Sequence, residues 1–276
     1  MEGEEAMTRV VAAMDDTPRA GAVLASAAAV AQLFDATLEA VHVQSEGWEI
    51  AAAHARRAGV PLEIADGGVV ESLVSIGSEH DVAALVLGTR EQHIADKPLG
   101  STALAVVGGV EKPIVLIPPR AAQLERIRRV LLPLEGTRRT SLAPTSVLEV
   151  ARSAAVDVIV LHVFDEASLP EFTDQPQHET EVWANEFLAR YCPVGLQSVS
   201  LALRIGEPAE TVVRVAEESG VDLIALGWNQ RLAPGRAAIV RAVLERGRLP
   251  LMLIPVTTNA RGGKPNDRRI RQLLGH

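Results

Sequence analysis

The sequence predicts an α/β fold in which two tandem domains each form an open, doubly wound parallel sheet with helices on its faces. The first observation behind this prediction is an internal repeat. Residues 10–44 align on residues 130–164, and residues 64–89 align on residues 203–228. The second observation is that short apolar runs alternate with helical periodicity within each copy, as α/β proteins require.

Four short runs of the first copy are predicted strands. Each is rich in β-branched and aliphatic residues and almost free of charge, as strands buried on both faces of a parallel sheet must be. They are Val10–Met14, Leu38–Val43, Ala83–Leu87 and Ile114–Ile117. Because helical segments separate them, the expected element order is β-α-β-α-β-α-β, and right-handed crossovers then give a parallel sheet.

Apolar stripes at helical spacing mark the segments between these strands. One stripe runs from Ala20 to Phe34, and a shorter one lies in 70–77. Thr17 followed by Pro18 predicts the start of the first helix, with Thr17 as the N-cap and proline at the first helical position.

The repeat also predicts the domain boundaries. A third repeated block, Pro-Ile/Leu-x-Leu-Ile-Pro, closes each copy. We therefore expect a first domain at 1–119, a linker at 120–129, a second domain at 130–256 and a basic C-terminal tail at 257–276. The offset between the copies grows by 19 residues after the second predicted strand, which places an insertion between Asp165 and about Thr180. Symmetric packing of the copies would bury the final strands, Ile114–Ile117 and Leu251–Ile254, whose edges would otherwise invite aggregation.

Composition and charge exclude several classes of protein. The net charge of the chain is −8. The last 20 residues have a net charge of +4, so the other residues together have a net charge of −12. An acidic surface disfavours nucleic acid as a partner. A single cysteine, Cys192, excludes a disulfide framework and a cysteine-based zinc site. The acidic N-terminus and the lack of a long apolar run argue against secretion and membrane insertion, so we expect a cytoplasmic protein.

Candidate site residues follow the strands, because open parallel sheets bind ligands beyond the carboxyl ends of their strands. Asp15 follows the first strand, Val43 ends the second, and Gly88 ends the third. Gly100, Ser101 and Thr102 stand at a predicted helix N-terminus, where free amides and hydroxyls favour an anion such as phosphate.

Structural roles remain open for these residues. Asp15 or Asp16 can hold a turn, Gly88 can relieve crowding, and Gly100 to Thr102 can form an ordinary cap. His42 and His162 lie in strand runs and are expected to be packed core histidines.

A set of shared motifs gives the chain a family resemblance. Each copy has an acidic residue after its first strand, His-Val at the end of its second, Gly-x-x-x-Glu before a helix, a strand ending in Leu-Gly, and the closing proline-flanked strand. In these features residues 10–256 resemble the universal stress protein family. The resemblance implies a small five-stranded doubly wound domain of the adenine-nucleotide α-hydrolase-like type. It also implies that a subgroup binds ATP or AMP through a loop with the pattern Gly-x2-Gly-x9-Gly-Ser/Thr.

The resemblance assigns candidate nucleotide contacts to the first copy. Asp15 and Val43 match the adenine and ribose contacts, Gly88 matches the first glycine of the loop, and Gly100-Ser101 matches its terminal Gly-Ser. The loop departs from the pattern, because Glu91 occupies the second glycine position and the following spacer has eight residues. The second copy departs further, with the substitutions Glu135, Gln230 and Gly235-Arg236, and is expected to be degenerate.

Three functional hypotheses follow. The first is a tandem universal stress protein that acts as a stress-response regulatory module, binds ATP or AMP, with magnesium, in its first domain, and has at most slow ATP hydrolysis. The alternative is a nucleotide-free interaction or dimerisation protein whose degenerate loops serve packing. The third, an enzyme that cleaves or transfers adenylate, lacks an acid and base placed with a nucleophile. Because the tandem copies supply each other's packing partner, we expect a monomer or a homodimer.

Overall fold

The computed structural model describes residues 7–43, 48–89, 100–134, 150–151, 153–164, 199–228, 234–246 and 248–255. The first half of the chain contains β1 (Arg9–Ala13), α1 (Ala20–Phe34), β2 (Thr37–Val43), α2 (Trp48–Ala58), β3 (Leu62–Ala65), α3 (Val69–Gly77), β4 (Val82–Gly88), α4 (Ser101–Gly109) and β5 (Ile114–Ile117). The second half contains β6 (Arg129–Pro133), β7 (Asp157–Phe164), β8 (Val199–Ile205), α7 (Pro208–Glu218), β9 (Leu223–Trp228), α8 (Pro234–Arg246) and β10 (Leu251–Pro255).

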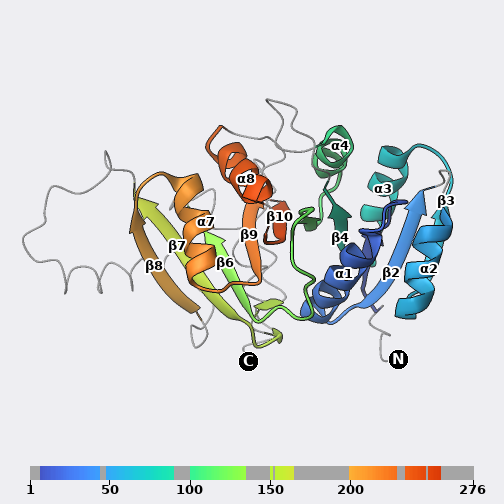
Figure 1. Ribbon diagram of the computed structural model, residues 1–276, viewed down its shortest axis with the longest axis horizontal. Coiled ribbons are helices and arrows are strands. Elements are labelled where there is room, and N and C mark those ends of the chain that lie inside the picture. The colour runs from blue at the N-terminus through green and yellow to red at the C-terminus, as the bar shows by residue number, and fades with distance from the viewer. Residues whose placement is uncertain are drawn as a thin grey trace, which may run out of the picture.

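The strands form one continuous sheet in the order β3-β2-β1-β4-β5-β10-β9-β6-β7-β8 (Figure 1). All pairs within each half are parallel. The halves meet where β5 and β10 pair in antiparallel fashion, with Val115 opposite Met252. The order of the second half mirrors that of the first, as approximate two-fold symmetry requires. The predicted pair of doubly wound parallel sheets is thus confirmed, and the two final strands join them edge to edge.

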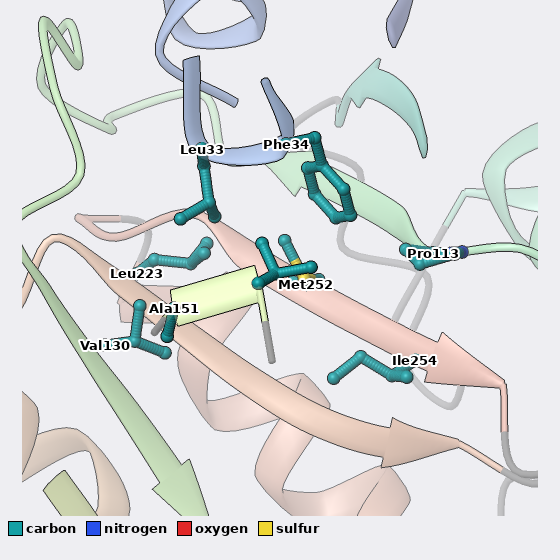
Figure 2. Close-up of a pocket in the computed structure, with 9 residues that line it drawn as sticks. Leu33, Phe34, Pro113, Val130, Ala151, Leu223, Met252 and Ile254 are labelled. Carbon is teal, nitrogen blue, oxygen red and sulfur yellow. The ribbon is translucent and has the colours of Figure 1, made fainter. Parts of the chain in front are cut away.

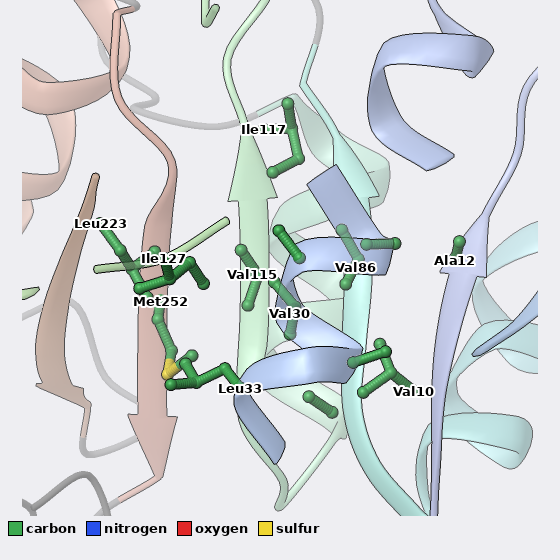
Figure 3. Close-up of a cluster of buried hydrophobic side chains, with 14 of the residues drawn as sticks. Val10, Ala12, Val30, Leu33, Val86, Val115, Ile117, Ile127, Leu223 and Met252 are labelled. Carbon is green, nitrogen blue, oxygen red and sulfur yellow. The ribbon is translucent and has the colours of Figure 1, made fainter. Parts of the chain in front are cut away.

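Helices cover both faces of the sheet, and side chains alternate between the two layers. On β1, Val10 and Ala12 belong to the core beneath α1 and α2, whereas Val11 belongs to the opposite core, beneath α3 and α4 and, in the second half, α7 and α8. All three side chains are fully buried. The first of these cores extends across the sheet junction, with Val115 and Ile117 of β5 on one side and Leu223 and Met252 on the other (Figure 3).

Helix α1 also links the two halves through its C-terminal end. Figure 2 shows Leu33 and Phe34 of α1 pointing toward Leu223 and Met252 of the second half. A small apolar cavity of about 40 Å³ remains between them. The junction is therefore a packed hydrophobic interface as well as a strand pairing.

Two sequence predictions need correction. The predicted order of elements in the first copy omitted α2 and β3, and the structure describes five strands in each half, the number that the family resemblance implied. The edge strand β3 is exposed at Glu63 and Ile64, and an exposed edge strand does not need the continuous apolar run that marks a central strand. The first helix begins at Ala20 and not at Pro18, because its first i→i−4 hydrogen bond runs from the Val23 amide to the carbonyl of Arg19, the N-cap, at 3.2 Å. The Thr17 hydroxyl bonds to Asp15 instead of capping the helix.

The domain boundaries and the insertion stay predictions. Strand β5 ends at Ile117 and β6 begins at Arg129, and the segment between them is the expected connector. The Asp222 carboxylate accepts hydrogen bonds from the backbone amides of Arg128 and Arg129 at 2.7 and 3.0 Å, which anchors the end of this connector. The predicted insertion and the tail lie outside the described residues.

Candidate functional site

A cavity of about 360 Å³ opens at the carboxyl ends of β1, β4 and β5. Strand order reverses between β1 and β4, since β1 continues to β2 on one side while β4 and β5 lie on the other. Ligands of open α/β sheets bind at such a reversal point. The cavity walls come from three places: the turn after β1 with the start of α1, the end of β4 at Gly88 and Thr89, and the connector residues Pro118, Pro119 and Ala121 after β5.

Asp15 lines this cavity and also holds the turn before α1. Its Oδ1 atom accepts hydrogen bonds from the Thr17 amide at 3.1 Å and from the Thr17 hydroxyl at 2.7 Å. This is the short-range pattern with which aspartate organises turns. The second carboxylate oxygen, Oδ2, has no hydrogen-bond partner among the residues that the structure describes. The turn-holding role that the sequence left open is therefore real, and it uses one oxygen of the carboxylate.

Gly88 lies where β4 passes close to Val23 of α1. A Cβ atom built on Gly88 would lie 3.0 Å from Cγ2 of Val23. The neighbouring Thr89 amide donates to the Ile117 carbonyl at 2.9 Å and so extends the β4–β5 pairing. Gly88 thus relieves crowding, as one sequence hypothesis held, and it also forms part of the cavity wall.

The other four predicted contacts are not among the described residues that line the cavity. Val43 is 6% exposed and packs into the core on the α3 side of the sheet. Gly100 precedes α4, and a Cβ atom built on it would meet no described heavy atom within 4 Å. Ser101 and Thr102 are exposed in the first turn of that helix. Glu91 and the spacer after it lie outside the described residues, as do Glu135 and Gln230. The structure therefore brings Asp15 and Gly88 together, and the six assignments stay a prediction.

Sequence reasoning missed Arg19 as a cavity residue. Arg19 is exposed, lines the cavity at the start of α1, and forms no ion pair with the described residues. A signal existed, because the repeat aligns Arg19 with Arg139. The connector wall was missed as well, because a proline-rich segment between two copies reads as a linker and not as a part of a site.

The two strand histidines occupy equivalent positions in the two halves. Nδ1 of His42 lies 3.0 Å from the Met14 carbonyl oxygen, and Nδ1 of His162 lies 2.9 Å from that of Leu134. His42 is 2% exposed, whereas His162 is only partly buried and packs edge-on against Phe164. His42 is thus a packed core histidine, as expected.

A cluster of ion pairs lies at the opposite, amino ends of the strands. The Arg9 guanidinium pairs with Glu39 and Asp81, both at 2.7 Å, and also with Glu79. The hydrogen bond from Arg9 lowers the pKa of the Asp81 carboxyl below its ordinary value. Because this cluster is remote from the cavity, we interpret it as a stabilising element.

Within the residues that the structure describes, no three His, Cys, Asp or Glu side chains gather as a metal site. None of the helices described has the length and apolar character needed to cross a bilayer.

Comparison with known proteins finds a family domain in the second half of the chain. Residues 126–255 match the sequence model of the universal stress protein family. The chain carries a universal stress protein domain. The resemblance inferred from the sequence motifs is thereby confirmed, and the first half repeats the universal stress protein topology of the matched half.

Solved structures extend the likeness over most of the chain. A functionally unknown protein from Pseudomonas aeruginosa PAO1 matches with a TM-score of 0.64 and 10% identity, covering 91% of this chain and 93% of that one. A universal stress protein from Archaeoglobus fulgidus matches with a TM-score of 0.61 and 14% identity, covering 91% and 97%. At these identities the likeness concerns the fold alone. A universal stress protein in complex with cAMP covers 48% of this chain and 98% of its own, with a TM-score of 0.36 and 16% identity. No curated protein matches the sequence of the chain.

Proposed function

We propose that this protein is a stress-response regulatory module that binds an adenine nucleotide, ATP or AMP, in the cavity of its first half. The observation that carries the proposal is the cavity at the strand-order reversal, which has Asp15 and Gly88 in its wall. Both residues are among those that the family resemblance assigns to nucleotide contact. The proposal concerns the first half alone, because the second copy has lost the short acid and the Gly-Ser pair.

The cavity has the size and chemistry for a nucleoside monophosphate. Its volume of about 360 Å³ lies within the range of small-molecule sites, which is about 300–1,000 Å³. Oδ2 of Asp15 supplies an acceptor for a ribose hydroxyl or an adenine amino group, and Val23 and Ile117 supply apolar contact. Arg19 supplies a positive charge for phosphate. In ATP, the outer phosphates would carry the magnesium ion, since the described residues bring no metal cluster of their own.

The proposed role is regulatory, with at most slow hydrolysis. The described cavity wall contains one acid, Asp15, and one cation, Arg19. The Thr17 hydroxyl does bond to the Asp15 carboxylate, but this contact holds the turn before α1, and no separate acid or base lies beside the pair in the described wall. A bound nucleotide would also contact the connector at Pro118 and Pro119, which leads directly to the second half. Binding can therefore change how the halves sit against each other, in a monomer or in a homodimer.

A second candidate is a nucleotide-free interaction protein. One observation favours it: Gly100, Ser101 and Thr102 are not among the described residues at the cavity. In this reading Asp15 and Gly88 serve only the turn and the packing against α1, roles that their contacts also support.

Nucleotide content separates the two candidates. The purified full chain is denatured, and the supernatant is analysed for adenine nucleotide by absorbance and chromatography. The stripped and refolded chain is then titrated with AMP, ATP and GMP by calorimetry. Recovery of an adenine nucleotide, or saturable binding of AMP or ATP in preference to GMP, supports the proposal. No adenine nucleotide together with no binding heat would overturn it in favour of the nucleotide-free protein.

A further inference from the structure

We infer that His42 is a positioning residue that sets Asp15 at the edge of the cavity. The expected effect on nucleotide binding rests on the proposed function. His42 itself is not among the described residues that line the cavity. His42 acts through Met14, the residue immediately before Asp15.

Met14 is held to β2 through both its backbone amide and its backbone carbonyl. Its amide donates to the Val41 carbonyl at 2.8 Å, which extends the parallel β1–β2 pairing one residue beyond β1. Its carbonyl oxygen lies 3.0 Å from Nδ1 of His42. Because a carbonyl oxygen only accepts, Nδ1 of His42 must carry the proton. The imidazole therefore replaces the backbone partner that the carbonyl would have in a longer strand.

This arrangement fixes the point at which the chain leaves the sheet. After Met14 the backbone forms the turn that the Asp15–Thr17 hydrogen bonds hold, and this turn leads into α1. The His42 ring is 2% exposed and enclosed by the core, so it is a rigid donor. Loss of this donor would leave the buried Met14 carbonyl unsatisfied and free the residue that precedes Asp15.

The second half contains the same arrangement. Nδ1 of His162 lies 2.9 Å from the Leu134 carbonyl oxygen, and the Leu134 amide donates to the Leu161 carbonyl at 2.8 Å. The two histidines thus terminate the first strand of each half in the same way. Because the proposed nucleotide site belongs to the first half, His162 provides a matched control for His42.

The test compares three variants of the full chain. His42→Leu removes the donor, and His42→Asn keeps an N–H group close to the position of Nδ1, since both nitrogens are bonded to Cγ. His162→Leu removes the equivalent donor in the second half. AMP affinity is measured by calorimetry, and amide hydrogen exchange of Thr17 is measured by NMR. The Thr17 amide reports the Asp15 turn directly, because it donates to Asp15 Oδ1.

Positioning by His42 predicts a selective pattern. His42→Leu should raise the Kd for AMP about tenfold and lower the protection of the Thr17 amide, and His42→Asn should restore most of both. His162→Leu should lower the melting temperature but leave AMP affinity and Thr17 protection unchanged. If His42→Leu does not fold, the His42→Asn variant is compared with His42→Gln, whose amide lies at the Nε2 position. Only the asparagine variant should bind as the unmodified chain does.

The outcomes separate this inference from the proposed function. If the unmodified chain binds neither AMP nor ATP, the proposed function fails, and Thr17 protection still decides the role of His42. If the chain binds AMP but neither affinity nor Thr17 protection changes in His42→Leu, the inference is wrong while the proposed function stands. Equal loss of AMP affinity in His42→Leu and His162→Leu would also overturn it, because the effect would then reflect stability and not position.

Discussion

Thr17 holds Asp15 twice, through its amide at 3.1 Å and through its hydroxyl at 2.7 Å, and both bonds end on the same carboxylate oxygen. The other oxygen is left for a ligand at the cavity. The consequence is that the orientation of Asp15 depends on a neighbour two residues away, within one turn.

Removal of the Thr17 hydroxyl should therefore weaken nucleotide binding without unfolding the protein. Thr17→Val keeps the branched shape and the amide bond but loses one hydrogen bond, which is worth about 1 kcal/mol, or about fivefold in Kd. Titration calorimetry with AMP measures the effect. Thr37→Val is the control, because its hydroxyl has only a long 3.4 Å contact with the Thr8 carbonyl at the far end of the sheet. Unchanged AMP affinity in Thr17→Val would contradict the role of this contact.

Arg19 should discriminate between ligands by their phosphate. Arg19→Ala should raise the Kd for AMP by about tenfold or more, since hydrogen bonds to charged groups contribute about 1.5–3 kcal/mol, and should leave the Kd for adenosine unchanged. The ratio of the two affinities is the informative quantity. Arg57→Ala removes the same charge from the exposed face of α2 and serves as the control. An equal loss for AMP and adenosine would show that Arg19 supports the cavity without contacting phosphate.

The sequence predicted the central strands well and the edges poorly. Strands β1, β2, β4 and β5 carry apolar runs because both faces of the sheet are covered, and their predicted bounds differ from the observed ones by at most one residue. The edge strand β3 is half-exposed, so its sequence, Leu-Glu-Ile-Ala, carries no such signal. The repeat predicted the symmetric contact of the halves, because β5 and β10 had equivalent apolar sequences and no other partner for their edges.

The site could be predicted only in part. Asp15 and Gly88 were accessible to sequence reasoning because they directly follow strands, and the topology brings strand ends together. Arg19 and the connector wall depend on how α1 and the residues after β5 fold back over those ends, which no local pattern encodes. The Thr17-Pro18 helix start was wrong for a local reason, since the Thr17 hydroxyl bonds to Asp15, two residues earlier, and not to the helix.

The packing of α1 across the junction should contribute strongly to stability. Leu33 is 8% exposed and contacts the second half beside the 40 Å³ cavity (Figure 2). Leu33→Ala should lower the free energy of unfolding by about 2–5 kcal/mol, because the existing void leaves little scope for the neighbours to fill the new one. Chemical denaturation measures this difference. Leu62→Ala, on the partly exposed edge strand β3, should cost clearly less, and similar losses in both variants would contradict a packed junction.

Acid should weaken the Arg9 cluster. The hydrogen bond from Arg9 lowers the pKa of Asp81, so the folded protein holds this carboxylate ionised more readily than the unfolded chain does. Its contribution is therefore complete above the unfolded pKa and is lost as the pH falls below about 4 through the folded pKa. Because the Asp81 side chain is 41% exposed, the contribution is at most about 1 kcal/mol.

Asp81→Asn should lower stability at pH 7 and reduce the difference in stability between pH 7 and pH 3, as followed by urea denaturation. Asp66→Asn removes an exposed carboxylate without a described ion pair and should change neither quantity.

The sharpest prediction concerns the asymmetry between the two halves. Gly100 has open space around it, and its φ of −56° suits any residue, so Gly100→Val should fold normally. If the phosphate of the nucleotide approaches the start of α4, the branched side chain should block it and raise the Kd for AMP about tenfold or more. Ser101→Ala should cost less binding free energy, about 0.5–1.5 kcal/mol for a neutral hydrogen bond or about 1.5–3 kcal/mol for a hydrogen bond to a charged phosphate. Gly235→Val at the start of α8 should leave affinity unchanged, because the second copy lacks the Gly-Ser pair. Titration calorimetry on the three variants decides the matter. A loss of affinity from Gly235→Val alone would move the site to the second half, and unchanged binding in Gly100→Val would confine the ligand to the Asp15 and Arg19 side of the cavity.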